Sequence, residues 1–342
     1  LESTESVEIL WKAKAIFWKG FFLIQQGKYD EAKILLNQSL EIFRDIKYRD
    51  GEAIALSSLG TIALFEGDYD KLISYSDESL TISVEINNRS YLARNLQNIG
   101  ICLMQQGKHE DARKKFEESL VIYRELNDTV QLAKLIGNIG ALEYLLSNYD
   151  KATAALNESL QLRYESGDRQ GIGIALSNLG SVAYMQKDYD KAKLRLEECI
   201  EIIRELGDRR IYVTPLSTLG SVEYDRGNFA TAVNLFRESM QISIELGDKY
   251  TTAKCFEGIA DILIKLKKYE EGCVLTSKYL SLLKASKKNI VEGEFQKADT
   301  TKEILVANLS DTDYKRIWAV GEAMKTEEAV EYMKLSVKDI LD

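Results

Sequence analysis

The sequence predicts an all-α solenoid of about seven helical hairpins, followed by a C-terminal helical cap. Two observations carry this prediction. Glycine recurs every forty residues, and the apolar residues within each forty-residue unit follow a helical spacing. A third observation agrees with them, because a single proline in 342 residues suits a chain that is nearly all helix.

Four columns of residues keep the same forty-residue register, which is typical of a solenoid. The first column is small, and it consists of Gly20, Gly60, Gly100, Gly140, Gly180, Gly220 and Ala260. The second is mostly aromatic, with Tyr29, Tyr69, His109, Tyr149, Tyr189, Phe229 and Tyr269. The third is mostly alanine, with Ala32, Leu72, Ala112, Ala152, Ala192, Ala232 and Gly272. The fourth is mostly serine, with Ser39, Ser79, Ser119, Ser159, Cys199, Ser239 and Tyr279.

Each unit reads as two helices joined by short turns. The first helix carries the glycine column, and the second begins at the aromatic column after turns such as GDYD or GNFA. We expect Asp or Asn before the aromatic residue to cap the second helices, at Asp68, Asn148, Asp188 and Asn228. The glycine column is expected to lie where the two helices approach closely, as with Gly180 opposite Ala192. Pro215 is expected in the first turn of its helix, with Thr214 as the cap.

The units divide the chain into three segments. Residues 1–12 are expected to be the start of an N-terminal helix or a linker. Residues 13–290 are expected to form the seven forty-residue repeats, and residues 291–342 the C-terminal capping helices. Solenoid ends need such caps because a terminal repeat has no neighbour on one side.

The columns resemble the tetratricopeptide repeat, whose pattern places Leu-Gly before Ala and a large apolar residue. Here the matching residues are Leu179 and Gly180 with Ala192 and Leu196. The resemblance implies a right-handed superhelix. The forty-residue variety, with ELGD at 205–208 and 245–248, resembles the C-terminal sensor region of signal-transduction ATPases with numerous domains (STAND proteins). The tail RIWAVGEAMKTEEAVEYMKL, residues 316–335, resembles a helix pair that ends many such chains.

The resemblance also implies where a ligand would bind. It places the residues two before, one after and four after each glycine-column residue on the inside of the superhelix. We name this surface the first-helix face. Its candidate groove residues for a ligand or peptide, with two nearby cations, are Arg94, Asn98, Ile101, Lys134, Asn138, Tyr144, Asn178, Ser181, Tyr184, Thr218 and Tyr224. Asparagine can hold an extended peptide backbone, and tyrosine offers contact area at low entropic cost. The alternative is that these Asn and Tyr side chains only fill gaps between repeats.

A second stretch of the first-helix face is expected to be acidic, with Asp225, Glu257 and Asp261.

The composition of the whole chain argues against several classes of function. The net charge of −9 without a Lys/Arg cluster argues against direct nucleic-acid binding. No apolar run is long enough to cross a bilayer, and the four cysteines lack metal or disulfide spacing, so we expect a reduced, cytoplasmic protein without metal.

No residue pattern indicates catalysis, a metal site or a cofactor. The only histidine, His109, stands in the aromatic column, and no P-loop motif occurs. We therefore expect a non-catalytic sensor module that binds a peptide, protein segment or small-molecule effector. The resemblance implies an attached or partner ATPase or effector domain before residue 1. The alternative is a constitutive protein–protein interaction scaffold without a ligand switch.

Overall fold

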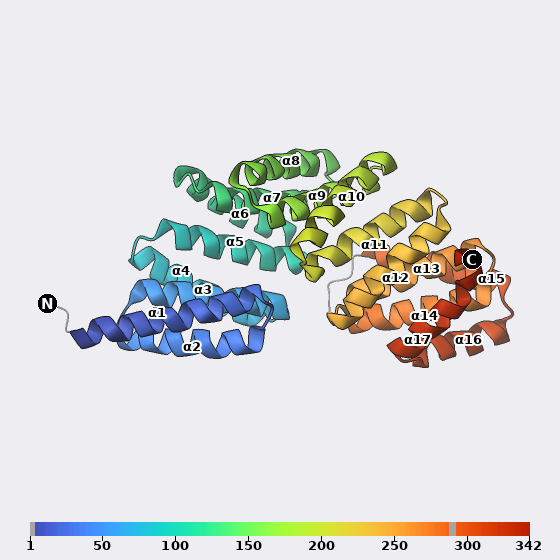
Figure 1. Ribbon diagram of the computed structural model, residues 1–342, viewed down its shortest axis with the longest axis horizontal. Coiled ribbons are helices and arrows are strands. Elements are labelled where there is room, and N and C mark those ends of the chain that lie inside the picture. Colours follow the sequence, from blue (N-terminus) through green and yellow to red (C-terminus); the bar gives the residue numbers. More distant parts are fainter. Residues whose placement is uncertain (1–3, 287–291) are drawn as a thin grey trace. The chain divides into compact units, whose positions relative to one another are not determined.

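The computed structural model describes residues 4–286 and 292–342, and all regular structure in these ranges is helical (Figure 1). The chain forms two compact units, the first ending at Leu162 and the second beginning at Arg163. The helices of the first unit are α1 (Thr4–Gln25), α2 (Tyr29–Asp45), α3 (Arg49–Glu66), α4 (Tyr69–Glu85), α5 (Arg89–Gln105), α6 (His109–Glu125), α7 (Thr129–Leu145) and most of α8 (Tyr149–Ser166).

The second unit continues the series and adds the cap. Its helices are α9 (Arg169–Met185), α10 (Tyr189–Leu206), α11 (Arg209–Asp225), α12 (Phe229–Glu245), α13 (Lys249–Lys265), α14 (Tyr269–Ala285), α15 (Glu292–Asn308), α16 (Asp311–Ala323), α17 (Thr326–Ser336) and α18 (Lys338–Leu341). Helices α1 to α14 pack as consecutive hairpins, so the fold is the all-α solenoid that the sequence predicts.

The glycine column lies where the two helices of a hairpin are closest. A methyl group on Gly100 would stand 2.5 Å from the ring of Phe116, and one on Gly180 would stand 2.6 Å from Leu196 Cγ. Gly60 differs, since its nearest neighbour would be Ser76 Oγ at 3.5 Å, an ordinary contact. Most of these glycines are therefore required by packing, and Gly60 is not.

In several hairpins the serine column joins the two helices by a hydrogen bond, whereas the Ser39 hydroxyl donates to Leu36 of its own helix. The Ser79, Ser119 and Ser239 hydroxyls donate to carbonyls of Ala53, Ala93 and Val213 over 2.8, 2.8 and 2.9 Å. These serines are fully buried, so the bond satisfies a hydroxyl that has no water. The serine recurs every forty residues because it makes the same contact between the two helices in these hairpins.

The turns between hairpins combine a helix stop and a helix start. In the ELGD turn, Gly207 takes the left-handed conformation, with φ +70°, and ends α10. Asp208 then caps α11 by accepting a hydrogen bond from the Arg210 amide. Asp168 and Asp248 cap α9 and α13 in the same way. Two adjacent residues thus finish one helix and begin the next.

The caps of the second helices follow the prediction only in part. Asp68 and Asp188 accept hydrogen bonds from backbone amides, as expected. Asn228 makes no cap hydrogen bond, and its Nδ2 instead donates to Glu223 Oε2 over 2.6 Å. Asn148 donates likewise to Glu143 Oε2 over 2.8 Å. Both glutamates are buried, and a buried carboxylate needs donors more than an exposed helix end does.

The prediction for Pro215 is wrong. Helix α11 begins at Arg209 under the Asp208 cap, so Pro215 lies inside the helix and Thr214 does not cap it. The Asp208 turn repeats the start signal of the neighbouring hairpins, and this signal outweighs the preference of proline for a first turn.

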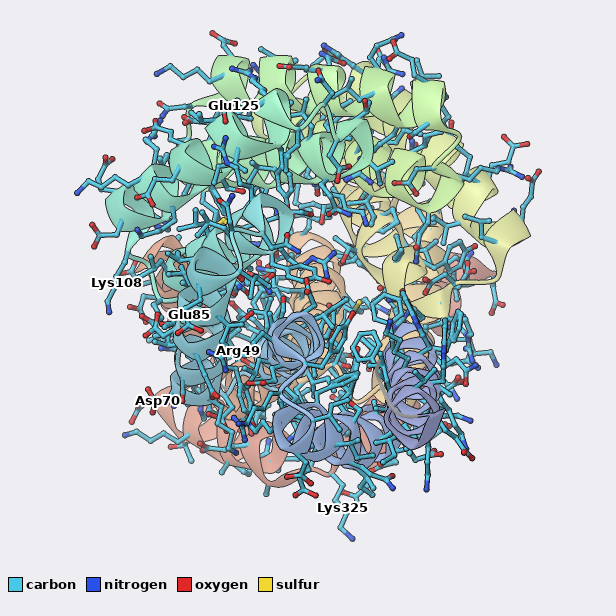
Figure 2. All side chains as sticks on the ribbon, turned by 90° about the vertical axis from the view of Figure 1, so that its left-hand side faces the viewer. Arg49, Asp70, Glu85, Lys108, Glu125 and Lys325 are labelled. Atoms are coloured by element: carbon cyan, nitrogen blue, oxygen red, sulfur yellow. The ribbon has the colours of Figure 1, made fainter. Side chains whose placement is uncertain are left out.

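Exposed ion pairs close several hairpins at one end. Each joins the first residue of a first helix to a glutamate at the end of the second helix. Arg49 pairs with Glu85 in the first unit (Figure 2), and Arg209 pairs with Glu245 over 2.6 Å in the second. Because both partners are about half exposed, each pair contributes at most about 1 kcal/mol.

The cap packs against α14 through the residues of the tail motif. Gly321 of α16 lies so close to α14 that a methyl group there would stand 2.3 Å from the Val274 carbonyl oxygen. Ser277 donates to the Trp318 carbonyl over 2.8 Å, and Lys278 Nζ donates to the Met324 carbonyl over 2.7 Å. The expected boundary at 290/291 lies outside the described residues, and α1 already covers most of the 1–12 segment.

Across residues 4–286 and 292–342, every helix is too short or too polar to span a bilayer.

Candidate binding surfaces on the first helices

In the first unit, the candidate residues lie on α5 and α7. Asn98 is 9% exposed, and its Nδ2 has no hydrogen-bond partner in the structure. Arg94 is half-buried, with its guanidinium 5.9 Å from the centre of the Tyr91 ring. Ile101 is half-buried and packs on the core of the α5–α6 hairpin. The face at α5 therefore combines a cation, an unused amide donor and an apolar side chain.

Helix α7 repeats part of this arrangement one hairpin later. Asn138 is half-buried, and Lys134 is exposed in the position that Arg94 has on α5. Tyr144 is half-buried, with its ring 6.2 Å from that of Tyr149 in the aromatic column. The first unit thus brings together six of the candidate residues on two neighbouring helices.

In the second unit, the remaining candidates lie on α9 and α11. Asn178 and Thr218 are half-buried, and the Ser181 hydroxyl donates to the Ser177 carbonyl of its own helix over 3.1 Å. The Tyr184 ring lies 6.1 Å from Tyr189, and the Tyr224 ring 6.0 Å from Phe229. Each tyrosine of this column packs at a tilted angle against the aromatic residue of its own hairpin turn, which gives it a packing role in addition to any contact with a ligand.

Asp225 is the polar partner of the Tyr184 hydroxyl. Burial raises the pKa of Tyr184, and the charge of Asp225 and its hydrogen bond with the tyrosine raise it further. The tyrosine therefore stays neutral at physiological pH and presents its hydroxyl as a donor.

The acidic stretch of this face carries a cation that was not predicted. Lys297 of α15 places its Nζ 3.1 Å from Glu257 Oε1 and 2.8 Å from Asp261 Oδ2. Lys254 also pairs with Glu257. Burial alone would raise the pKa of Glu257, but Lys254 and Lys297 outweigh it and lower this pKa. Burial raises the pKa of Asp261, and Lys297 offsets this only in part.

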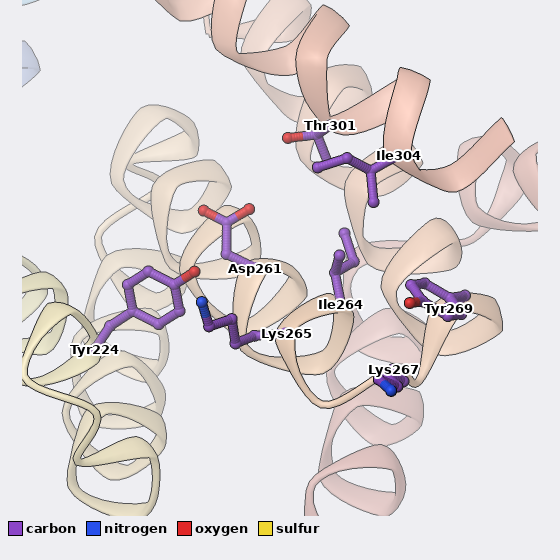
Figure 3. A pocket seen from close by; sticks show the side chains of 8 residues that line it. All are labelled: Tyr224, Asp261, Ile264, Lys265, Lys267, Tyr269, Thr301 and Ile304. Carbon is purple, nitrogen blue, oxygen red and sulfur yellow. The ribbon is translucent and has the colours of Figure 1, made fainter. Parts of the chain in front are cut away.

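Beside this ion pair an open pocket of about 380 Å³ lies between α15 and the first-helix face (Figure 3). Its lining is Tyr224, Asp261, Ile264, Lys265, Lys267, Tyr269, Thr301 and Ile304. Two of these residues, Thr301 and Ile304, belong to α15. The forty-residue register gave no signal for them, because α15 lies beyond the last repeat.

Family comparisons agree with the repeat pattern. A model of the tetratricopeptide repeat matches residues 13–71, 51–125 and 131–205, which together exceed half of the chain. A second tetratricopeptide repeat model matches residues 216–246. Repeats of this family generally form protein–protein interaction surfaces. A comparison with curated proteins found no significant match.

Solved structures share the fold at low sequence identity. The apo form of RapI aligns with a TM-score of 0.61 and 16% identity, over 85% of this chain and 99% of that chain. A STAND protein with a tetratricopeptide repeat sensor from Pyrococcus horikoshii aligns with a TM-score of 0.59 and 14% identity, over 96% of this chain. The present chain spans 47% of that protein's length. BtubC from P. vanneervenii aligns with a TM-score of 0.53 and 20% identity, over 63% of this chain and 91% of that chain.

With hairpins packed at the glycine column, joined at the serine column and matched by family models over most of their length, this chain belongs to the tetratricopeptide repeat family.

Proposed function

We propose that this chain is a non-catalytic binding module that holds an extended peptide or protein segment on its first-helix face. The unpaired Nδ2 donor of Asn98 carries the proposal, because it is a buried amide on that face. A buried polar group without a partner costs about 1–3 kcal/mol. A carbonyl of a bound peptide backbone would accept this hydrogen bond and recover the cost.

The neighbouring helix supports an extended ligand. Asn138 repeats the amide of Asn98 one hairpin later, and Lys134 repeats the cation of Arg94. A segment with acidic side chains would match these two cations, while Ile101 would contact an apolar side chain. In the second unit, Asn178, Ser181 and Thr218 would offer polar groups, and Tyr184 and Tyr224 would offer contact area.

We further propose that the module is the sensor part of a larger signalling ATPase or transcription regulator. Its ligand would be a peptide, a protein segment or a small-molecule effector, and an attached or partner ATPase domain would respond to occupancy. The forty-residue ELGD pattern and the fold shared with the P. horikoshii STAND protein support this role. The second candidate is a constitutive scaffold that uses the outer surfaces of the second helices.

An array of short synthetic peptides tests the binding proposal. Peptides that bind the wild type are titrated against the double variant Asn98→Ala and Asn138→Ala. We expect each lost hydrogen bond to weaken binding by about 1–3 kcal/mol, or roughly 5- to 150-fold in Kd. Asn157→Ala is the control, since Asn157 is exposed on a second helix. Binding that survives the double variant but is lost with Asn157→Ala would support the scaffold instead.

A further inference from the structure

Helix α15 packs on α14, and it reaches the first-helix face of α13 through Lys297 and across an open pocket. Lys297 pairs with Asp261 and Glu257 of α13, and Thr301 and Ile304 face Asp261 and Ile264 across the pocket (Figure 3). Asp261 and Ile264 stand one and four residues after the glycine-column position Ala260. A helix from outside the repeats therefore contacts the positions that, in the other hairpins, are the candidate binding residues.

Within residues 297–308, few apolar side chains of α15 are buried. Among residues 297–308 the buried apolar side chains are Ala298 and Leu305, whereas Ile304 and Val306 are 42% and 50% exposed. By contrast, α14 has a long run of buried side chains in the same unit. Because apolar burial supplies most of the packing free energy of a helix, we expect the position of residues 297–308 to depend strongly on Lys297.

The two carboxylates require a cation at this point of the surface. The side chains of Glu257 and Asp261 are 7% and 14% exposed, so neither is well solvated. Glu257 has Lys254 as a second partner, but within the described part of the chain Lys297 is the only cation paired with Asp261. Anything that replaced α15 on this face would have to supply a positive charge to the same place.

We infer that α15 is an internal competitor that occupies the first-helix face of the last hairpin, and that a partner helix carrying Lys or Arg displaces it. The spacing in α15 describes that partner. Lys297 reaches the carboxylates and Ile304 lines the pocket seven residues later, which places both on one side of a helix. The partner would thus present a basic residue and, two turns onward, an apolar one. This inference rests on the proposed function in using the same face.

Hydrogen exchange of the full chain tests whether Lys297 holds α15. With Lys297→Gln, we expect the amides of residues 298–308 to exchange at least about tenfold faster, while those of α13, α14 and α16 stay within about twofold. Lys297→Arg should retain the wild-type exchange, because the guanidinium can pair with both carboxylates. Lys315→Gln is the matched control, since Lys315 pairs with Asp311 of its own helix on the exposed surface of α16.

A labelled synthetic peptide of residues 292–308 tests competition directly. We expect it to bind the Lys297→Gln chain at least about tenfold more tightly than the wild-type chain, whose own α15 occupies the site. A peptide with Gln in place of Lys297 should lose this binding. Unchanged exchange in α15, equal acceleration in α13 and α14, or no preference of the peptide for the Lys297→Gln chain would each overturn the inference. None of these readouts involves Asn98 or Asn138, so they are independent of the peptide-array test.

Discussion

Replacing Gly100 and Gly60 by alanine should have opposite effects on stability, although both belong to the same column. Alanine is the better helix former by about 0.8–1 kcal/mol, so propensity alone favours both changes. At Gly100 the new methyl would stand 2.5 Å from the fully buried Phe116 ring. Overpacking of this kind costs about 1–3 kcal/mol. Once the gain in propensity is subtracted, we expect Gly100→Ala to destabilise the chain by up to about 2 kcal/mol.

Gly60→Ala should stabilise the chain by about 0.5–1 kcal/mol, since its methyl would meet only Ser76 Oγ at 3.5 Å. Urea unfolding, followed by far-UV circular dichroism, gives the shift of midpoint for each variant against the wild type.

A double variant isolates the proposed cause. Phe116→Leu removes ring atoms from the contact, so Gly100→Ala should cost less in that background than in the wild type, with a coupling energy above about 0.5 kcal/mol. Equal destabilisation by the two glycine substitutions, or a cost of Gly100→Ala that is the same in both backgrounds, would refute the assignment of the glycine column to close helix packing.

Two further predictions concern the turns and the core. Lys187 adopts φ +61° at a turn position where four other hairpins have glycine. Lys187→Gly should therefore raise the free energy of unfolding by about 0.5–1 kcal/mol, measured by thermal unfolding. Gly227→Lys should lower the free energy of unfolding. Burial raises the pKa of Tyr123 to about 12, so the folded state holds this proton more tightly than the unfolded state. The resulting stability is present below about pH 10 and is lost as the pH rises towards 12, by at most about 2–3 kcal/mol. Urea midpoints at pH 8 and 11 should therefore differ less in Tyr123→Phe than in the wild type, and an equal difference would contradict the prediction.

Periodicity predicted most of the fold because each column has one physical cause. The Gly180 prediction works because a close interhelical contact recurs at most glycines of the column. The Ser119 prediction works because an equivalent carbonyl lies opposite Ser79 and Ser239. Deviations within a column are harder to see. Asn228 stands at the same repeat position as Asp188, yet its side-chain amide donates to the buried Glu223 and does not cap the helix. Only Asn228 and Glu223 considered together would have predicted this hydrogen bond.

The candidate site was less predictable than the fold. The equivalent positions of Asn98 on α5 and Asn138 on α7 follow from their spacing in the repeats, but the unpaired donor of Asn98 depends on side-chain packing that spacing does not determine. The acidic stretch at Asp261 was expected, whereas its partner Lys297 was not. Lys297 lies outside the repeat register, and the approach of α15 to α13 is a tertiary contact without a local signal.

The turn in which Gly207 ends one helix and Asp208 starts the next has a consequence for how such chains change in length. Because stop and start signals are adjacent and most hairpins have their own glycine or serine contact between the two helices, a forty-residue block contains most of the local signals that define its hairpin. Duplication or loss of a whole block joins equivalent ends, whereas a shift of a few residues separates the stop from the start. Unequal recombination between repeats can therefore lengthen or shorten the protein in whole steps while its end cap is retained.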